Sequence, residues 1–140
     1  VKIYFQFLEI NNLPKSRPLV ITLNKKTYTC PVDLTLSLVD GKWKILILSQ
    51  LHQFSRRGFG EIRNNLPRVS EKMLMQQLKE LQRDNLIDKH ILSQKPYRVE
   101  YFLTDQGKSM SPLFEFLSRW GIDYLKSHNI EYIRDQHLYK

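Results

Sequence analysis

Apolar residues recur three or four positions apart along most of the chain after residue 30. This spacing is clearest over residues 42–54, where Trp43, Ile47 and Leu51 fall on one side of a predicted helix. Shorter helices are predicted over 31–39, where Pro31 suits a first turn, and over 60–66, which should end before Pro67. A longer helix is predicted over 70–84, with Ser70 as its N-cap.

The next two stretches lack helical spacing. Residues 86–92 and 98–103 are extended runs joined by the polar turn 93–97, which predicts a β-hairpin with a basic tip. Asn85 precedes the hairpin and is expected to end the helix 70–84 in a left-handed conformation. A last, long helix is predicted from Thr104 or Asp105 to about residue 127.

The first residues follow a different pattern. Residues 1–10 and 19–23 read as extended, with Pro14 and Pro18 between them. A strand pair, an arm over a partner subunit and a non-native tail all fit this pattern. We therefore divide the chain into an N-terminal extension (1–24), one domain (25–128) and a C-terminal tail (129–140).

The order of the predicted elements indicates the fold class. Two helices, a short helix, a tight turn, a longer helix, a hairpin and a final helix describe a helix-turn-helix with a β wing. The expected fold is therefore mainly α with a small β wing, and the flanking helices are free to form a dimer.

Charge points to the partner. The chain has 140 residues and a net charge of +8, which favours an anionic partner, with nucleic acid first. Residues 41–79 contain eight Lys or Arg against two acidic residues, a net charge of +6. Positive charge is thus concentrated on the half of the chain that is predicted to read DNA.

Other classes of protein fit the composition less well. No run of 18 apolar residues occurs, so we expect no membrane-spanning helix. The four histidines and the one cysteine show no metal-ligand spacing, and neither a phosphate-binding glycine loop nor a catalytic triad stands out. We expect no enzyme, no cofactor and no metal. A single cysteine favours the reducing cytoplasm.

The predicted helix 70–84 has two distinct faces. Leu74, Leu78 and Leu81 fall on one side and are expected to face the core. The opposite stripe carries three cations, one amide and no acidic residue, with Met75 at its border: Lys72, Gln76, Lys79 and Arg83. Side chains of these types read base edges and bind phosphates.

Several separate motifs resemble one family in the order in which they occur. The runs Cys30-Pro31-Val32-Asp33-Leu34-Thr35-Leu36 and Gly41-Lys42-Trp43-Lys44 are similar to the opening signature of HxlR-type regulators. The resemblance continues through Phe59-Gly60-Glu61-Ile62, Ser70-Glu71-Lys72-Met73-Leu74, Leu78-Lys79-Glu80-Leu81, Asn85-Leu86-Ile87, Arg98-Val99-Glu100-Tyr101-Phe102-Leu103-Thr104 and Gly107. It covers about residues 25–125; a glycine is usual in the family where this chain has Asn85.

The resemblance implies a function and assigns roles to the predicted elements. HxlR-type proteins are homodimeric winged helix-turn-helix transcriptional regulators, similar in architecture to MarR-type regulators, that bind palindromic operators. By this similarity residues 60–66 form the supporting helix, 70–84 the recognition helix and 93–98 the wing tip. We therefore expect a sequence-specific regulator that binds duplex DNA.

The expected DNA contacts divide into three groups. Base edges are expected to be read by Lys72, Met75 and Gln76. Phosphates are expected to be bound by Arg56, Arg57, Arg68, Ser70, Lys79 and Arg83. The wing is expected to contribute Lys95, Tyr97 and Arg98.

The last helix predicts a homodimer. Its apolar stripe is too wide for one small winged-helix core to cover, and a large exposed patch usually marks an interface. The interface is expected to include Met110, Leu113, Phe114, Leu117, Trp120 and Tyr124. A fold-back of residues 1–10 in the same subunit is the alternative. A two-fold dimer would place its recognition helices about 34 Å apart, one turn of DNA.

Cys30 is a candidate sensor of oxidants or electrophiles. It falls at the start of the predicted helix 31–39, where the positive helix end stabilises a thiolate and raises its reactivity. By the family resemblance, several HxlR-type regulators look like sensors of electrophiles or oxidants that act through a cysteine at this position. A lone cysteine is more often a small buried apolar residue, so a structural Cys30 is the alternative.

Two other functions fit the same sequence. A winged helix can serve as a protein-interaction module whose basic face binds an acidic partner. A regulator gated by a small molecule, with a structural Cys30, would hold its ligand between Trp43 and the dimerisation helices.

Overall fold

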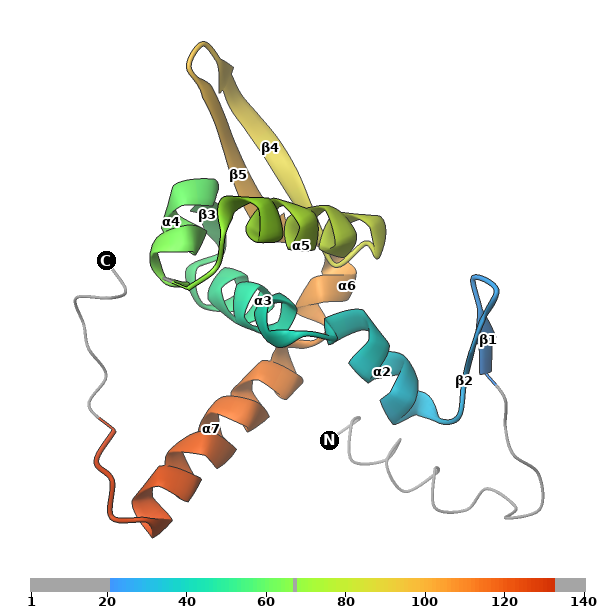
Figure 1. Cartoon of the computed structure of the whole chain (residues 1–140), viewed down its shortest axis with the longest axis vertical. Coiled ribbons are helices and arrows are strands. Elements are labelled where there is room, and N and C mark those ends of the chain that lie inside the picture. Colours follow the sequence, from blue (N-terminus) through green and yellow to red (C-terminus); the bar gives the residue numbers. More distant parts are fainter. Residues whose placement is uncertain (1–20, 67, 133–140) are drawn as a thin grey trace. The chain divides into compact units, whose positions relative to one another are not determined.

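The computed structural model describes residues 21–66 and 68–132, and these belong to two compact units, Val1–Ser37 and Leu38–Lys140. Figure 1 labels their helices and strands. Each unit is taken by itself below. The predicted domain limits at 24/25 and 128/129 stay predictions.

The described part of the first unit contains a short hairpin. Strand β1 (Ile21–Leu23) pairs antiparallel with β2 (Lys26–Tyr28), and Asn24 and Lys25 form the turn with φ of 50° and 64°. A turn with two positive φ angles matches the twist of a two-stranded hairpin. The extended run 19–23 thus forms a strand from residue 21, and its partner β2 was not predicted. The extended run 1–10 lies outside the described residues.

Helix α2 (Pro31–Val39) begins where the sequence predicts it. Its first turn is closed by Asp33, whose Oδ2 accepts hydrogen bonds from the backbone N–H of Thr29 at 2.8 Å and from the Thr29 hydroxyl at 3.2 Å. A carboxylate in the first turn also faces the positive end of the helix. The N-terminus of α2 is therefore held by Thr29 and Asp33 on either side of Cys30.

Three helices enclose the core of the second unit: α3 (Lys42–Phe54), α4 (Phe59–Asn64) and α5 (Glu71–Arg83). Their inward side chains are fully buried: Ile47, Leu48, Leu51, Ile62, Leu74, Leu78 and Leu81. Each such side chain contributes roughly 2 kcal/mol by its removal from water. The predicted helix 42–54 and the core face of α5 are confirmed. Helix α4 starts one residue before the predicted 60–66 and ends two residues earlier; Pro67, its expected terminator, lies outside the described residues.

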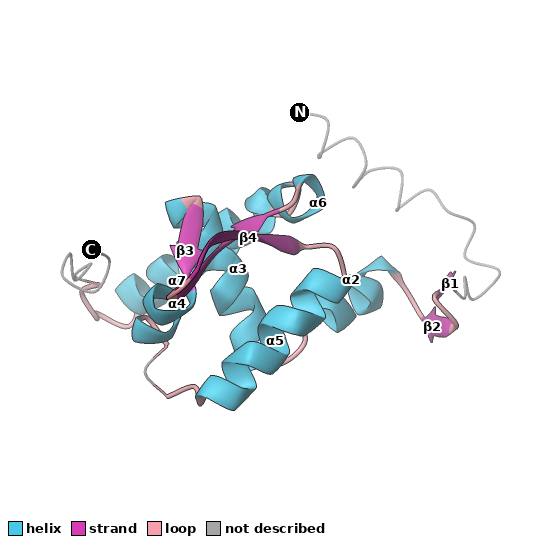
Figure 2. Cartoon of the chain, turned by 90° about the horizontal axis from the view of Figure 1, so that it is seen from above, coloured by secondary structure: helices cyan, strands magenta, loops and turns pink. Residues whose placement is uncertain are grey.

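The sheet of the second unit has three strands rather than the expected two. Strands β3 (Arg56–Gly58), β5 (Tyr97–Leu103) and β4 (Ile87–Gln94), all labelled in Figure 1, are antiparallel in the order β3-β5-β4. Figure 2 shows the strands in magenta. The sequence analysis treated 56–58 only as a break between helices. Its pairing with β5 joins segments more than forty residues apart, which local periodicity does not report.

The hairpin of β4 and β5 is longer than predicted. The strands extend to Gln94 and from Tyr97, so that the connection is Lys95-Pro96 instead of residues 93–97. A register shift between Ile91 and Ser93 admits one extra residue into β4. The basic tip that the sequence predicts is retained.

The prediction of one long helix over 104–127 is wrong, because the chain forms two helices there. Helix α6 (Asp105–Lys108) is a single turn, and α7 (Ser111–Ser127) follows it. Pro112 lies in the first turn of α7. Its ring would collide with the carbonyl of the residue four positions earlier in a continuous helix, so the helix restarts instead.

The end of α5, the start of β4 and helix α6 meet at one tight junction. Asn85 has a φ of 57°, as predicted for the residue that ends the helix, and its carbonyl accepts a 2.6 Å hydrogen bond from the Thr104 hydroxyl. Thr104 caps α6 by accepting from the N–H of Gly107 at 3.0 Å. A Cβ on Gly107 would lie 2.0 Å from the carbonyl oxygen of Leu86, so only glycine fits there.

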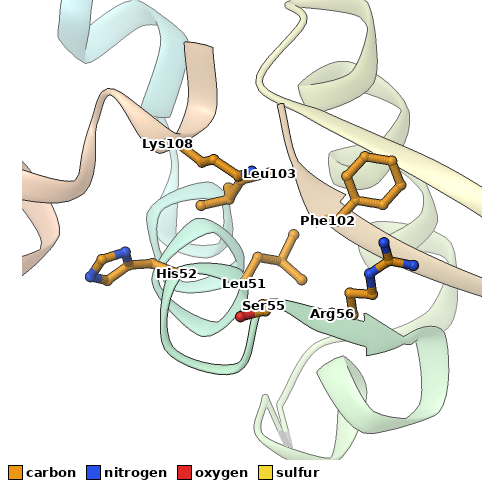
Figure 3. A pocket seen from close by; sticks show the side chains of 7 residues that line it. All are labelled: Leu51, His52, Ser55, Arg56, Phe102, Leu103 and Lys108. Carbon is orange, nitrogen blue, oxygen red and sulfur yellow. The ribbon is translucent and has the colours of Figure 1, made fainter. Parts of the chain in front are cut away.

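A small hollow of about 210 Å³ opens beside this core (Figure 3). Its lining combines apolar and cationic side chains from α3, the sheet and α6: Leu51, His52, Ser55, Arg56, Phe102, Leu103 and Lys108.

Among the helices that the structure describes, none has the length and apolar character needed to cross a bilayer.

Candidate nucleic-acid interface

Helix α5, which the sequence analysis expects to be the recognition helix, begins with a complete N-cap. The Ser70 hydroxyl oxygen accepts a hydrogen bond from the N–H of Met73 at 3.1 Å, and Glu71 follows in the first turn. Glu71 also forms an ion pair with Arg63 of α4. The cap and the ion pair define where α5 starts and tie it to the supporting helix α4.

One exposed face of α5 brings the predicted base-reading residues together. A shallow hollow on this face is lined by Lys72, Met75, Gln76, Lys79 and Glu80. Met75 is 39% exposed, and the opposite side of the helix carries the buried leucines. The helix therefore presents two cations, an amide and a thioether to solvent on a rigid support.

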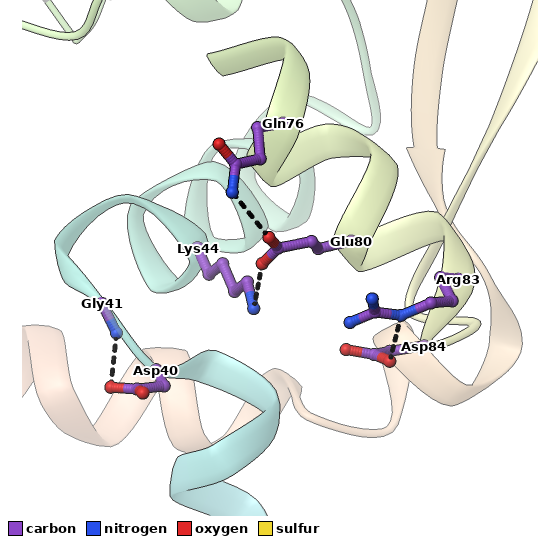
Figure 4. Close-up of polar contacts among 7 residues, drawn as sticks. All are labelled: Asp40, Gly41, Lys44, Gln76, Glu80, Arg83 and Asp84. Atoms are coloured by element: carbon purple, nitrogen blue, oxygen red, sulfur yellow. Dashed lines mark hydrogen bonds and ion pairs between the residues drawn. The ribbon is translucent and has the colours of Figure 1, made fainter. Parts of the chain in front are cut away.

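Glu80 is the residue of this face that the sequence analysis missed. Its Oε1 accepts a 3.1 Å hydrogen bond from Nε2 of Gln76, and its Oε2 lies 2.8 Å from Nζ of Lys44 (Figure 4). The hydrogen bond from Lys44, and then that from Gln76, hold the pKa of Glu80 below its ordinary value. The stripe described as free of acidic residues thus borders on a carboxylate; the i, i+4 spacing of Gln76 and Glu80 was the available signal.

Lys44 is buried although it is a cation. It is 6% exposed, and its partner Glu80 compensates the charge between α3 and α5. A buried lysine without such a partner would be strongly unfavourable. The charge count over 41–79 therefore overstates the free cations, because Lys44 is not presented to solvent.

Arg57 differs most from its predicted role as a phosphate ligand. It is 5% exposed, its guanidinium carbon lies 3.7 Å from the ring centroid of Phe54, and its Nη1 is 3.9 Å from Oε1 of Glu61. A cation enclosed in this way has no surface to offer to a DNA backbone. Arg57 instead packs β3 against α3, and we assign it no DNA contact.

The remaining predicted phosphate ligands lie on the surface. Arg68 and Lys79 are exposed beside the start and the middle of α5. Arg56 is exposed, with Nη1 3.6 Å from Oε2 of Glu100, and Arg83 has its Nε 3.5 Å from Oδ1 of Asp84. Surface ion pairs of this kind contribute little free energy, so both arginines can exchange partners.

The wing residues lie on the hairpin of β4 and β5. Figure 1 shows this hairpin projecting from the second unit beyond α4 and α5. Lys95, Tyr97 and Arg98 are exposed at its tip, Tyr97 by 57%. The hairpin thus presents two cations and one aromatic ring away from the core.

The residues predicted for the dimer interface separate into two sets. Phe114 is 4% exposed and belongs to the core of its own chain, against which Met110 also packs. Leu117, Trp120 and Tyr124 are 47%, 59% and 51% exposed. Including Phe114 in the interface was wrong, because periodicity shows which side of a helix is apolar but not where the chain's own core ends.

Cys30 is exposed and has no disulfide partner. Its backbone carbonyl accepts the first hydrogen bond of α2, from the N–H of Leu34 at 3.1 Å. The thiol therefore lies in solvent at the start of a helix, in the first unit.

Comparisons with known proteins fit this geometry. A model of the HxlR-like helix-turn-helix family matches residues 38–129. The uncharacterised HTH-type transcriptional regulator YdzF of Bacillus subtilis (strain 168) is 44% identical over 92 residues, which are 66% of this chain and 84% of YdzF. The crystal structure of YtcD, an uncharacterised HTH-type transcriptional regulator of the same organism, gives a TM-score of 0.64 at 34% identity over 69% of this chain and 98% of YtcD.

A redox regulator is among the similar structures. HypR in its reduced form gives a TM-score of 0.62 at 33% identity over 70% of this chain and 99% of HypR, and an oxidised form is also known. The range matched by the family model begins after Cys30 and contains α5, the hairpin of β4 and β5, and α7. The chain is therefore a winged helix-turn-helix transcriptional regulator, not an enzyme, and it belongs to the HxlR-like helix-turn-helix family.

Proposed function

We propose that this regulator binds a near-palindromic operator in duplex DNA as a homodimer, with α5 in the major groove. The observation that carries the proposal is the exposed face of α5, which presents Lys72, Gln76 and Lys79 on a helix whose other side is buried. An α-helix fits the major groove, and these side chains match base edges and phosphates. We place such a regulator in the cytoplasm, together with the DNA that it binds.

The proposed contacts follow the positions of the side chains. Lys72, Met75 and Gln76 read base edges, since they line one hollow on α5. Other exposed groups bind phosphates: Arg56, Arg68, Ser70, Lys79 and Arg83. The wing adds Lys95, Tyr97 and Arg98 at a neighbouring stretch of backbone.

The exposed face of α7 supports the homodimer. Trp120 stacks on Tyr124 with ring centroids 5.3 Å apart, and Leu117 and Phe116 extend the same exposed apolar surface. Aromatic side chains of this kind are enriched at the centres of interfaces. Pairing two copies through α7 would remove this surface from water.

Cys30 is the proposed switch for oxidants or electrophiles. Its exposure supports this role, and so does the resemblance to HypR, a redox regulator. Because the chain has one cysteine, the reactions left to it are alkylation, a mixed disulfide with a small thiol, and a bond between the Cys30 residues of two chains. A bond between two chains requires Cα atoms within about 7 Å.

The test is fluorescence anisotropy on a duplex selected from a random library, with reduced and with oxidant-treated protein. We expect tight, sequence-selective binding that weakens as salt rises and changes after oxidation. A Cys30→Ser variant should bind equally well and ignore the oxidant. Selective binding that is indifferent to oxidant would remove Cys30 as the switch and direct attention to small ligands for the hollow of Figure 3. Binding without sequence preference would contradict the operator.

A further inference from the structure

The Gln76 side chain is held by two successive contacts that begin inside the protein. Lys44 of α3 is 6% exposed, and its Nζ lies 2.8 Å from Oε2 of Glu80. The other oxygen of Glu80 accepts the 3.1 Å hydrogen bond from Nε2 of Gln76. Burial restricts the position of the Lys44 ammonium, and the ion pair with it orients the carboxylate of Glu80. The hydrogen bond to that carboxylate then orients the amide of Gln76 (Figure 4).

The direction of the amide follows from the chemistry of its partner. An ionised carboxylate only accepts hydrogen bonds, so only the NH₂ end of an amide can face it. The hydrogen bonds from Lys44 and Gln76 lower the pKa of Glu80, which is therefore ionised at neutral pH. The amide oxygen of Gln76 is consequently directed away from Glu80, as Figure 4 shows.

A glutamine held in this way has one donor fewer for DNA. A free amide can donate two hydrogen bonds to N7 and O6 of guanine, or donate one and accept one from adenine. With one N–H used by Glu80, Gln76 keeps one N–H and its oxygen. The free N–H can donate to N7 of adenine while the amide oxygen accepts from its N6 amino group. Guanine presents two acceptors, N7 and O6, so the amide oxygen of Gln76 would face an acceptor and make no hydrogen bond.

We propose that the Lys44–Glu80 pair makes Gln76 read adenine in preference to guanine. This inference rests on the proposed DNA-binding function and adds the identity of one base pair to it. Glu80 is a positioning residue, since it acts on DNA through Gln76. Specificity at this base pair then depends on α3, a helix behind the reading surface.

The experiment is a selection from a duplex library with a randomised segment, carried out with wild type, Gln76→Ala, Glu80→Gln and Glu71→Gln. The base pair at which Gln76→Ala loses its preference is the one that Gln76 reads. There, wild type should favour A over G by about tenfold. In Glu80→Gln the amide oxygen must face the ammonium of Lys44, which only donates, so the new NH₂ faces Gln76 and reverses the Gln76 amide. The ratio should therefore fall to about twofold or less, with other positions unchanged.

Glu71→Gln is the matched control. It removes the same charge from the same helix, and Glu71 pairs with Arg63 rather than with Gln76. It should therefore keep the wild-type ratio of A to G. Circular dichroism and thermal unfolding of each variant verify that it is folded.

A second measurement needs only wild type and Gln76→Ala. Replacing the adenine by 7-deazaadenine removes the N7 acceptor, so wild-type binding should weaken about fivefold while Gln76→Ala binding stays the same. Three results would overturn the proposal. Wild type could bind the 7-deazaadenine duplex with unchanged affinity, or it could select guanine instead of adenine at the base pair that Gln76 reads. The Glu80→Gln variant could also keep the wild-type ratio of A to G. The proposed function itself would fail differently: wild type would then enrich no sequence at all.

Discussion

Helices α5 and α7 have similar amphipathic patterns, but their apolar faces differ in how far the second unit buries them. Leu74, Leu78 and Leu81 of α5 are each 0% exposed. On α7 only Phe114 reaches the core, while Trp120 and Tyr124 are more than half exposed. The same periodicity therefore yields a face buried by its own chain in one helix and an unburied face in the other.

This difference separates two kinds of function. Burial of its leucines makes α5 a rigid support, and what it presents outward is polar and basic, as a DNA-reading surface requires. Helix α7 presents aromatic and aliphatic groups, as a protein interface does. The experiments below test whether this contrast governs stability, assembly and DNA binding.

Removing a buried leucine from α5 should have the largest effect. Leu78→Ala should lower the free energy of unfolding by about 3 kcal/mol, because it leaves a cavity in the core. Urea unfolding followed by circular dichroism measures this. Leu92→Ala, at a 48% exposed position of the wing, is the control and should change it by less than about 0.5 kcal/mol. Similar losses in both variants would break the contrast between buried and exposed leucines.

An acidic group on the apolar face of α7 should act on assembly. Trp120→Glu should raise the dissociation constant of the homodimer about thirtyfold or more, since a charge would replace a central aromatic contact. Sedimentation equilibrium at micromolar concentration measures the change. Ser118→Glu adds the same charge at an exposed polar position of α7 and should leave the dimer intact. A wild-type protein that sediments as a monomer would refute the interface.

The pair that ties α5 to α3 should give a pH-dependent contribution. Because the pKa of Glu80 is lowered in the folded chain, its contribution is present above the ordinary pKa of about 4.5 and is lost as pH falls through the folded value. Glu80→Gln keeps an oxygen that accepts from Lys44 and loses only the opposite charge, so it should cost about 1 kcal/mol at pH 7 and progressively less below pH 4.5. Thermal unfolding of both proteins across this range tests it. A difference between them that is constant with pH would contradict the ion pair.

Removing one wing cation should have the smallest effect. Lys95→Ala should weaken binding severalfold to all duplexes alike and reduce the slope of log K against log salt by about 1, because one phosphate contact is lost. Lys126→Ala removes a cation from the last turn of α7 and should change neither quantity. A loss confined to particular sequences would instead mark Lys95 as a base-reading residue.

The sequence was sufficient to predict what local periodicity and caps determine. The helix 42–54, the Ser70 cap, the buried leucines of α5 and the left-handed Asn85 all follow from patterns within a few residues. Strand β3 escaped prediction because three residues carry no period and its partner is distant. The break before α7 could have been found from Pro112.

The candidate site was predictable in type more than in detail. Which cations reach solvent depends on tertiary packing, so Lys44 and Arg57 counted as surface charge although the fold encloses both. Arg57 is covered because the pairing of β3 with the distant strand β5 holds it over Phe54, and local periodicity does not report that pairing. Phe114 was misplaced for a similar reason, since its packing against α3 decides how far the core extends along α7.

The junction at Gly107 also has a mechanical consequence. The absence of a Cβ there lets α6 press against the carbonyl of Leu86, so the end of the recognition helix, the base of the wing and the root of α7 form one joint. Helix α7 has 17 residues and extends about 25 Å from that joint, so a rotation of about 5° displaces its far end by about 2 Å. In the proposed dimer joined through α7, small rotations of α7 at the dimer contact would change the distance between the two copies of α5. The spacing of operator half-sites that the dimer can bind would then depend on this angle.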